Sequence, residues 1–526
     1  MLFPTLGAAT RCIDFVIQRE PRYSEQVNVV QLVLDVSKAA SALVRKLAPT
    51  IAAVMLPREA FSLAKQYWQH SGDGISSRRA EFCHALFKDH LLVPSARAAS
   101  PASKSTRGPR RYQRSSVDDT AANGEAQTAP AKSSVEESQE SLRFLEERFG
   151  RNLDLNLVER AKSAIRRRIA GSVVQDIDLQ SEASQRTAQD STGRHNIDES
   201  NVYLFPAGMN AIFNAHRALL AARGPLKSIN FGFPYVDTLK ILQKFGPGCE
   251  FFGHASSDDL DELETLLRRG VRFLALFCEF PGNPLLTCPD LKRIRRLADE
   301  FDFAVVVDET IGTFANVNVL PAADIVVSSL TKIFSGDSNV MGGSAIINPD
   351  SKFCQQLKGA MDSIYEDTYW PEDAVFMERN SRDFLQRIIR INANAEAICA
   401  TLQSHPNVKR IYYPKLNPSK NHYDDFKLPE MGYGGLLSVV FHRKTQAQVF
   451  YDAISTAKGP SLGTNFTLCS PYVILAHYQE LEWAASFGVA EDLVRVSVGL
   501  EETRSLQTIF ERALRASEEN DGPPGQ

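Results

Sequence analysis

The feature that most constrains the fold is a series of short apolar runs that alternate with amphipathic stretches in the middle of the chain. Phe273–Cys278 and Phe303–Val307 are continuous apolar runs, and Ile325–Val327 is the core of a third. Leu260–Arg268 and Leu291–Phe301 have the apolar spacing of helices. Because apolar runs of this length are typical of strands buried on both faces, the alternation predicts an α/β domain with a mostly parallel sheet.

Shifts in composition divide the 526 residues into several regions. Residues 1–94 form an extension that we expect to be partly helical, with Val27–Leu47 as one helical stretch. Residues 95–140 are rich in Ser, Ala, Pro and charged side chains and predict a disordered linker. We expect the α/β domain to span 141–400, a smaller α+β domain to span 401–516, and a frayed tail to follow at 517–526.

The overall composition argues against several classes of protein. A net charge of −4 shows no general affinity for nucleic acid or membranes. The eight cysteines have no CxxC spacing, so we expect reduced thiols, no metal site and a cytoplasmic location. No apolar run reaches about 18 residues, and no basic cluster precedes the first apolar stretch. Neither a transmembrane helix nor a secretory signal is therefore predicted.

One basic cluster lies in the predicted linker. It surrounds Tyr112 and consists of Arg107, Arg110, Arg111 and Arg114. A nuclear signal or a nucleic-acid contact is one interpretation. Acidic residues follow closely, so a solvated cluster of charges in a disordered segment is the favoured interpretation.

Lys332 ends the segment Ser329-Leu330-Thr331-Lys332, and Asp308 ends the apolar run before it. A lysine can form a Schiff base with the aldehyde of pyridoxal phosphate (PLP), and hydroxyls just before it can bind the phosphate. An aspartate such as Asp308 keeps the pyridine nitrogen protonated, so that the ring accepts electrons from a carbanion. Most isolated lysines of this kind are solvated surface residues. The prediction of a PLP site therefore depends on the surrounding motifs.

A second motif predicts the phosphate site. Pro206–Ile212 follows a short apolar run and opens a helical stretch. Small residues at a helix start leave backbone N–H groups and the positive end of the helix dipole open to an anion. We expect Ala207, Gly208 and Met209 to contribute there, with an ordinary loop glycine as the alternative.

Two further side chains are candidates for contacts with the ring. Tyr235 could stack on the pyridine, although an isolated tyrosine is more often a core residue. Asn283 could bond the phenolic oxygen, although a plain turn asparagine is the alternative. Ligands of open α/β sheets gather at the carboxyl ends of strands, and Asn283, Asp308 and Ser329 each follow an apolar run.

Arg495 lies inside the apolar run Leu493–Val498. A guanidinium in such surroundings needs a partner, and the α-carboxylate of a substrate offers a bidentate one. A structural ion pair is the alternative.

In this order, the motifs resemble the cystathionine γ-synthase family of PLP enzymes, also called the Cys/Met metabolism family. The resemblance covers about Phe149 to Arg512. It implies an aminotransferase-like, fold type I architecture and PLP as cofactor. The implied catalytic residues are Lys332, Tyr235 and Asp308. The implied cofactor-binding residues are Ala207, Gly208, Met209, Tyr235, Asn283, Asp308, Thr310, Ser329, Thr331, Lys332 and Arg151.

Two segments connect the chain to this family in finer detail. Phe149-Gly150-Arg151 is similar to the family's Tyr-x-Arg segment, in which the arginine reaches the phosphate of a neighbouring subunit. Arg151 therefore implies a homodimer or homotetramer, while Phe149 lacks the hydroxyl. The stretch Ser461–Leu468 is similar to the family's substrate-side Ser-Leu-Gly segment, so we expect Arg495, Thr467 and Asn465 to bind the substrate.

Phe466 stands where many family members carry a glutamate, and this variant with its long N-terminal extension looks most like the fungal branch. The resemblance implies γ-replacement on an O-acyl-homoserine with cysteine, which gives cystathionine in methionine biosynthesis. The alternatives are the same chemistry with sulfide or a carbon nucleophile, or a γ- or β-lyase. A less favoured alternative is a regulator that binds nucleic acid through its N-terminal region.

Overall fold

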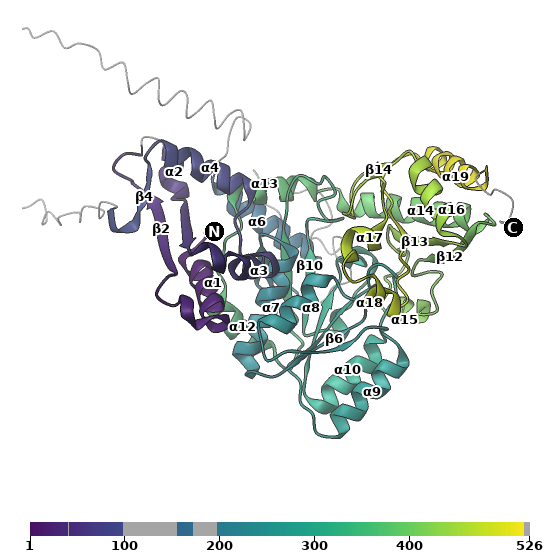
Figure 1. Ribbon diagram of the computed structural model, residues 1–526, viewed down its shortest axis with the longest axis horizontal. Coiled ribbons are helices and arrows are strands. Elements are labelled where there is room, and N and C mark those ends of the chain that lie inside the picture. The colour runs from purple at the N-terminus through teal and green to yellow at the C-terminus, as the bar shows by residue number, and fades with distance from the viewer. Residues whose placement is uncertain (40–41, 98–154, 172–196, 520–526) are drawn as a thin grey trace, which may run out of the picture. The chain divides into compact units, whose positions relative to one another are not determined.

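The computed structural model describes residues 1–39, 42–97, 155–171 and 197–519, and these form two compact units (Figure 1). The first unit contains Met1–Ala64 and Ser77–Asn156, and the second joins Lys65–Ser76 to the chain from Leu157 onward. Apart from the short turn Ser95–Arg97, the predicted linker lies outside the described residues. The basic cluster and the segment with Phe149 and Arg151 also lie outside them.

The first unit is built on a four-stranded antiparallel sheet. Its order is β1-β3-β2-β4, and the strands are β1 (Leu2–Phe3), β2 (Asn28–Leu34), β3 (Thr50–Met55) and β4 (Leu92–Pro94). Helix α1 (Leu6–Arg19) packs on β2 and β3, and α2 (Ala42–Leu47) and α4 (Ser77–Lys88) belong to the same unit.

The expectation that Val27–Leu47 is helical is wrong for most of its length. Asn28–Leu34 is a strand, and only the end of the stretch, Ala42–Leu47, forms a helix. β2 pairs with β3 on one side and with β4 on the other, and its sequence Asn-Val-Val-Gln-Leu-Val-Leu is rich in β-branched residues. Pairing on both edges, which the local apolar spacing does not reveal, therefore decides the conformation.

The second unit contains the predicted α/β sheet. Its seven strands run in the order β5-β11-β10-β9-β8-β6-β7. Strands β7, β6, β8, β9 and β10 are parallel to one another, while β11 is antiparallel to both β10 and β5. The strands are β5 (Val202–Phe205), β6 (Ser228–Phe231), β7 (Cys249–Phe252), β8 (Ala275–Glu279), β9 (Ala304–Asp308), β10 (Ile325–Ser329) and β11 (Gly343–Ile347). The three strands predicted from apolar runs are thus confirmed as β8, β9 and β10.

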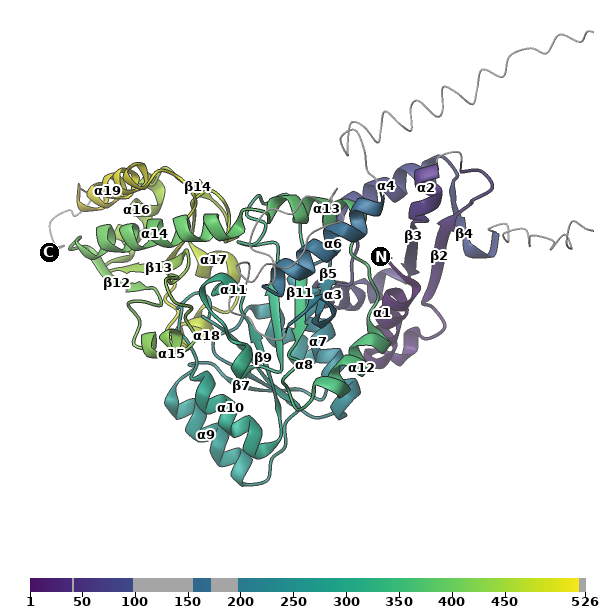
Figure 2. The ribbon, with the colours of Figure 1, turned by 180° about the vertical axis from the view of Figure 1, so that it is seen from behind.

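Helices cover this sheet. Helix α7 (Gly208–Arg223) packs on β10 and β11, α8 (Val236–Lys244) on β6 and β7, and α10 (Leu291–Phe301) on β9. Helix α9 (Ser257–Arg268) lies beside α10 in both views (Figures 1 and 2). The predicted helices 260–268 and 291–301 are therefore confirmed. The same unit includes α6 (Leu155–Ile169), α11 (Thr313–Asn316), α12 (Cys354–Ile364) and α13 (Pro371–Asn380).

A second, five-stranded sheet forms the C-terminal part of this unit. Its order is β12-β13-β16-β15-β14, from β12 (Val408–Tyr412), β13 (Leu436–Phe441), β14 (Ala457–Lys458), β15 (Leu468–Ser470) and β16 (Val494–Ser497). Helices α14 (Phe384–Gln403), α16 (Lys444–Ala453) and α19 (Thr503–Glu519) lie together in both views and share a core with this sheet (Figures 1 and 2). Val440 packs in a separate core with α17 (Tyr472–His477) and α18 (Leu481–Ser486).

Two predicted boundaries need correction. Residue 400 lies inside α14, whose Ile398 and Leu402 belong to the same C-terminal core, so the division falls before this helix. The tail does not begin at 517, because α19 continues to Glu519 and Ser517 is buried within it. The Ser517 hydroxyl accepts a hydrogen bond from Asn407 at 3.1 Å. No helix in the described ranges is long and apolar enough to cross a membrane.

Candidate active site

A cavity of about 260 Å³ opens where β8, β9 and β10 end. Its volume is just below the range of about 300–1,000 Å³ that is usual for ligand sites. Ten of the residues singled out from the sequence line it: Ala207, Gly208, Met209, Tyr235, Asn283, Asp308, Thr310, Ser329, Thr331 and Lys332. The structure thus brings together residues that are spread over more than 120 positions of the sequence.

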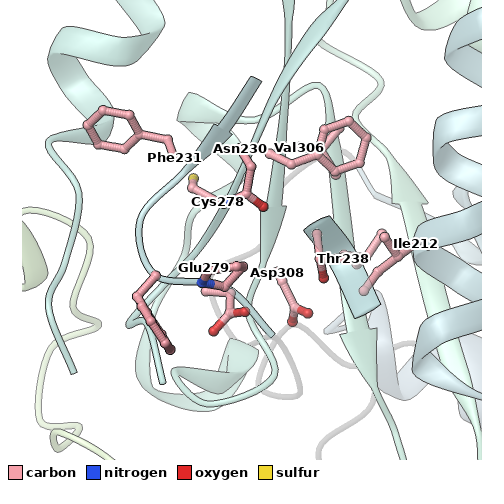
Figure 3. Close-up of a pocket in the computed structure, with 12 residues that line it drawn as sticks. Ile212, Asn230, Phe231, Thr238, Cys278, Glu279, Val306 and Asp308 are labelled. Carbon is pink, nitrogen blue, oxygen red and sulfur yellow. The ribbon is translucent and has the colours of Figure 1, made fainter. Parts of the chain in front are cut away.

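The strand register determines which side chains meet at this edge. Asp308 is the partner of Glu279 on β8 and of Val327 on β10. The carboxylates of Glu279 and Asp308 lie beside one another in Figure 3. Because parallel strands end at the same edge of a sheet, the last residues of neighbouring strands converge on one point.

Lys332 follows β10 and lines the cavity. Its Nζ donates a hydrogen bond to Ser461 Oγ at 3.1 Å. Burial and, second, the positive charge of Arg495 lower the pKa of Lys332 from 10.5 to about 8. A substantial fraction of this amine is therefore neutral near physiological pH, as addition to an aldehyde requires.

The start of α7 has no side-chain cap, as the predicted anion site requires. Ala207 is the N-cap residue, and no side chain caps the helix. A Cβ added to Gly208 would lie 2.6 Å from Ser329 Cβ, so only glycine allows the helix to approach β10 this closely. Ser329 and Thr331 line the same cavity, which places two hydroxyl-bearing residues near the backbone N–H groups of the helix start.

Asp308 lies on the cavity wall, and Thr310 supports it. The Thr310 N–H donates to Asp308 Oδ1 at 2.8 Å, and Thr310 Oγ1 accepts the N–H of Ser329 at 2.8 Å. Burial raises the pKa of Asp308, and the hydrogen bonds from Thr310 oppose this shift. None of the ion pairs within the described ranges includes Asp308, so its carboxylate is available to a cation in the cavity.

Arg495 is 2% exposed and is held beside the cavity by neutral oxygens. Its Nη1 donates to Asn283 Oδ1 at 3.0 Å, and its Nη2 donates to the carbonyls of Pro460 and Ser461. The guanidinium lies 4.2 Å from the centre of the Tyr472 ring, and burial lowers the pKa of Arg495 to about 10. No carboxylate pairs with Arg495 in the part of the chain that the structure describes, which disfavours a structural ion pair.

Glu279 is a site residue that the sequence reasoning missed. Its carboxylate accepts the backbone N–H of Tyr235 and, at 3.1 Å, that of Asn283. Burial and the neighbouring charge of Asp308 raise the pKa of Glu279 to about 8. Glu279 thus connects the turns that carry Tyr235 and Asn283. The available signal was its place at the end of an apolar run, beside Asp308 in register.

The structure does not bring Thr467 and Asn465 into this cavity. The Thr467 hydroxyl donates to Glu501 at 2.8 Å and accepts the N–H of Gly499 at 3.0 Å. Asn465 Oδ1 accepts from Arg387 at 3.0 Å. Both side chains are engaged with protein groups, so their predicted contact with the substrate has no support in this geometry.

The fold and the site define a PLP-dependent enzyme of the aminotransferase-like class. The family model for the Cys/Met metabolism PLP-dependent enzymes matches residues 197–515, and the N-terminal domain of fungal trans-sulfuration enzymes matches residues 1–76. The chain belongs to the Cys/Met metabolism family of PLP-dependent enzymes.

Individual relatives agree with this assignment. A cystathionine gamma-synthase of Neurospora crassa is 60% identical over 100% of this chain and 87% of its own length. One of Saccharomyces cerevisiae is 37% identical over 98% of this chain and 88% of its own length. The crystal structure of a cystathionine gamma synthase from Xanthomonas oryzae pv. oryzae has a similar fold, with a TM-score of 0.54 and 22% identity over 69% of this chain and 98% of that one.

The described residues fit PLP in three respects. The uncapped start of α7 suits a phosphate, and the absence of a side chain at Gly208 lets Ser329 lie close to this helix start. The carboxylate of Asp308 has no described cation beside it, which suits a protonated pyridine nitrogen. The lowered pKa of Lys332 suits a covalent bond to the aldehyde. In the described residues no cluster of side chains suited to a metal ion occurs.

The lowered pKa of Lys332 predicts how the apoenzyme takes up PLP. Only the neutral amine reacts, so the rate at which the visible band of the lysine-bound cofactor appears should rise with pH and level off above about 8. Arg495→Gln removes the charge that helps to lower this pKa, so its profile should shift to higher pH. Stopped-flow absorbance at a series of pH values measures both profiles. A rate that keeps rising toward pH 10.5 would contradict the assignment of Lys332.

Proposed function

We propose that this enzyme replaces the γ-acyloxy group of an O-acyl-homoserine with the sulfur of cysteine, giving cystathionine and a free carboxylic acid. The proposal is carried by one observation, the common cavity of Lys332 and Asp308 beside the buried Arg495. The 60% identity to a protein named cystathionine gamma-synthase supports the choice of reaction within the family.

In this proposal, Arg495 binds the α-carboxylate of the amino-acid substrate. Its guanidinium is desolvated and held in place by Asn283 and two backbone carbonyls, so the orientation is fixed before the substrate arrives. A carboxylate would supply the opposite charge that the described surroundings of Arg495 lack. The interaction fixes the substrate amine toward the Lys332 side of the cavity, because Lys332 contacts Ser461, whose carbonyl also holds Arg495.

When bound, PLP supplies an electron sink that stabilises negative charge at the substrate Cα and, in turn, at Cβ. Asp308 supports this role through its charge, which favours protonation of the ring nitrogen. Lys332 Nζ would remove the proton from Cα and then one from Cβ, so that the γ-acyloxy group can leave, and would return protons to these carbons after the sulfur has added; a pKa near 8 is well suited to both directions of transfer. Tyr235 lines the same cavity and would cover one face of the ring, which would limit access of water.

The nucleophile is tested by product analysis. Purified holoenzyme should convert acetyl- or succinyl-homoserine to cystathionine when cysteine is present, as measured by chromatography and mass spectrometry. Phe466 is 42% exposed and apolar, so it offers no charge to the ammonium of cysteine and makes sulfide or a carbon nucleophile the second candidate. Faster turnover with sulfide or a carbon acid would favour that nucleophile over cysteine. Cleavage of the ester with no nucleophile added would favour a lyase reaction.

Lys332→Ala tests the catalytic role of Lys332. The variant should lose turnover by at least about three orders of magnitude, because general base catalysis and positioning are lost together. It should also lose the visible band of the lysine-bound cofactor, while far-ultraviolet circular dichroism stays unchanged. Lys358→Ala, which changes a partly buried lysine of α12 that does not line the cavity, is the control. Retained activity in Lys332→Ala would overturn the proposed site.

We also propose that the enzyme is at least a homodimer and acts in the cytoplasm. The support for the oligomer is Arg151, which the family resemblance assigns to the phosphate of a neighbouring subunit. Size-exclusion chromatography with light scattering should give at least twice the 58.3 kDa of one chain. A monomer that retains tight PLP binding would exclude a shared site, and cell fractionation would test the location.

A further inference from the structure

One short segment of the N-terminal region belongs, by its contacts, to the catalytic unit. Lys65–Ser76 clusters with the chain from Leu157 onward, although the chain on either side of it belongs to the first unit. The segment contains most of α3 (Phe61–Ser71) and the turn that follows it. None of its residues takes part in the mechanism above, yet its side chains reach the first turns of α7 and α8.

The first contact is with the start of α7. Asn210, the third residue of this helix, is 3% exposed, and its Nδ2 donates to Asp73 Oδ1 at 2.8 Å and to the Ser71 carbonyl at 3.0 Å. The other carboxylate oxygen of Asp73 accepts the hydroxyl of Tyr67 at 2.5 Å. Because buried polar groups are costly without their partners, these bonds hold the helix start and the segment in one arrangement.

The turn itself approaches the helix closely. Gly72 has a φ of +68°, and a Cβ at this position would lie 2.8 Å from the backbone nitrogen of Asn210. A side chain there would be strained in its backbone and would collide with the first turn of α7. The turn therefore fits directly against the backbone that, in the proposed cofactor placement, receives the phosphate.

The second contact is with the start of α8. His70 Nδ1 lies 2.7 Å from Asp237 Oδ1, and both side chains are largely buried. Asp237 is the second residue of α8, two positions after Tyr235. Tyr235 is the N-cap residue of α8, so the first turn of this helix directly follows it. His70 thus holds the first turn of α8, which begins immediately after Tyr235.

We propose that Lys65–Ser76 is a positioning element of the cofactor site. Asp73 fixes the phosphate-binding start of α7 through Asn210, and His70 fixes the turn that carries Tyr235 through Asp237. A single segment thereby sets the spacing between the phosphate site and the residue that covers the ring. The proposal rests on the cofactor placement given above, but it does not depend on which nucleophile the enzyme uses.

The test measures binding of PLP to the full-length apoenzyme, together with circular dichroism of the bound cofactor in the visible range. The first readout reports the phosphate site and the second reports how the ring is held. Gln69→Ala is the matched control, because Gln69 lies in the same helix turn with an exposed side chain. The variants that break the contacts are Asp73→Ala, Asn210→Ala, the double variant of these two and His70→Phe. The conservative variants are Asp73→Asn and His70→Gln.

Asp73→Ala and Asn210→Ala should each weaken PLP binding about tenfold, since each removes a hydrogen bond that involves a buried charge. The double variant should weaken PLP binding by clearly less than the product of the two single effects, because both single variants remove the hydrogen bond between Asn210 and Asp73. His70→Phe should change the visible circular dichroism. Asp73→Asn and His70→Gln, which keep an acceptor for Asn210 and a donor for Asp237, should restore most of the wild-type behaviour. Gln69→Ala should match the wild type.

Two outcomes would overturn the proposal. A lower melting temperature of the apoenzyme with unchanged PLP affinity and unchanged circular dichroism would show a structural role alone. Purely additive effects of Asp73→Ala and Asn210→Ala would show that the two residues act separately. If Asp73→Ala does not fold, Asn210→Ala decides the question, because it leaves the carboxylate bonded to Tyr67. Gly208→Ala tests the underlying placement: unchanged PLP affinity there would refute the phosphate site and not the contact with Asp73.

Discussion

The parallel register of β8, β9 and β10 is the constraint on which the site depends. Glu279 and Asp308 are register partners on neighbouring strands, and Ser329 ends the third strand. A shift of one residue along any of these strands would turn its terminal side chain to the opposite face of the sheet. The apolar residues that fill the strands therefore do more than form a core, because the point at which each apolar run ends determines which polar side chain the strand presents at its carboxyl end.

The same edge of the sheet concentrates charge in a small volume. Burial and the positive charge of Arg495 lower the pKa of Lys332, while burial and the negative charge of Asp308 raise the pKa of Glu279. Glu279 gains hydrogen bonds from two backbone N–H groups, whereas Arg495 has only neutral oxygens around it in the described chain. A cavity with unpaired charge of both signs is suited to a ligand with a cationic ring, an anionic phosphate and an anionic carboxylate.

Much of this site could be predicted from the sequence because its residues lie directly after apolar runs or at a helix start. Ten predicted residues line one cavity for that reason. Glu279 could not be predicted as a site residue, because its role depends on its pairing with Asp308 on the neighbouring strand. A single segment of sequence does not show which strands pair. Thr467 and Asn465 lie in a segment similar to the family's, but Glu501 and Arg387 occupy their side chains. The strand Asn28–Leu34 was predicted as helix because its partners, β3 and β4, lie far away in the sequence.

The contacts of Lys65–Ser76 could not be predicted from the sequence for the same reason, because their partners lie far away along the chain. Nothing in its composition indicates a contact with Asn210, which lies 137 residues beyond Asp73. The entropy of closing so long a loop rises only with the logarithm of its length, by about 0.6 kcal/mol for each doubling. A few buried hydrogen bonds, each contributing about 0.5–1.5 kcal/mol, are enough to offset an increase of this size. The contact of Lys65–Ser76 with the starts of α7 and α8 therefore depends on Gly72, Asp73 and His70 keeping their partners, and only weakly on the distance along the chain that separates them.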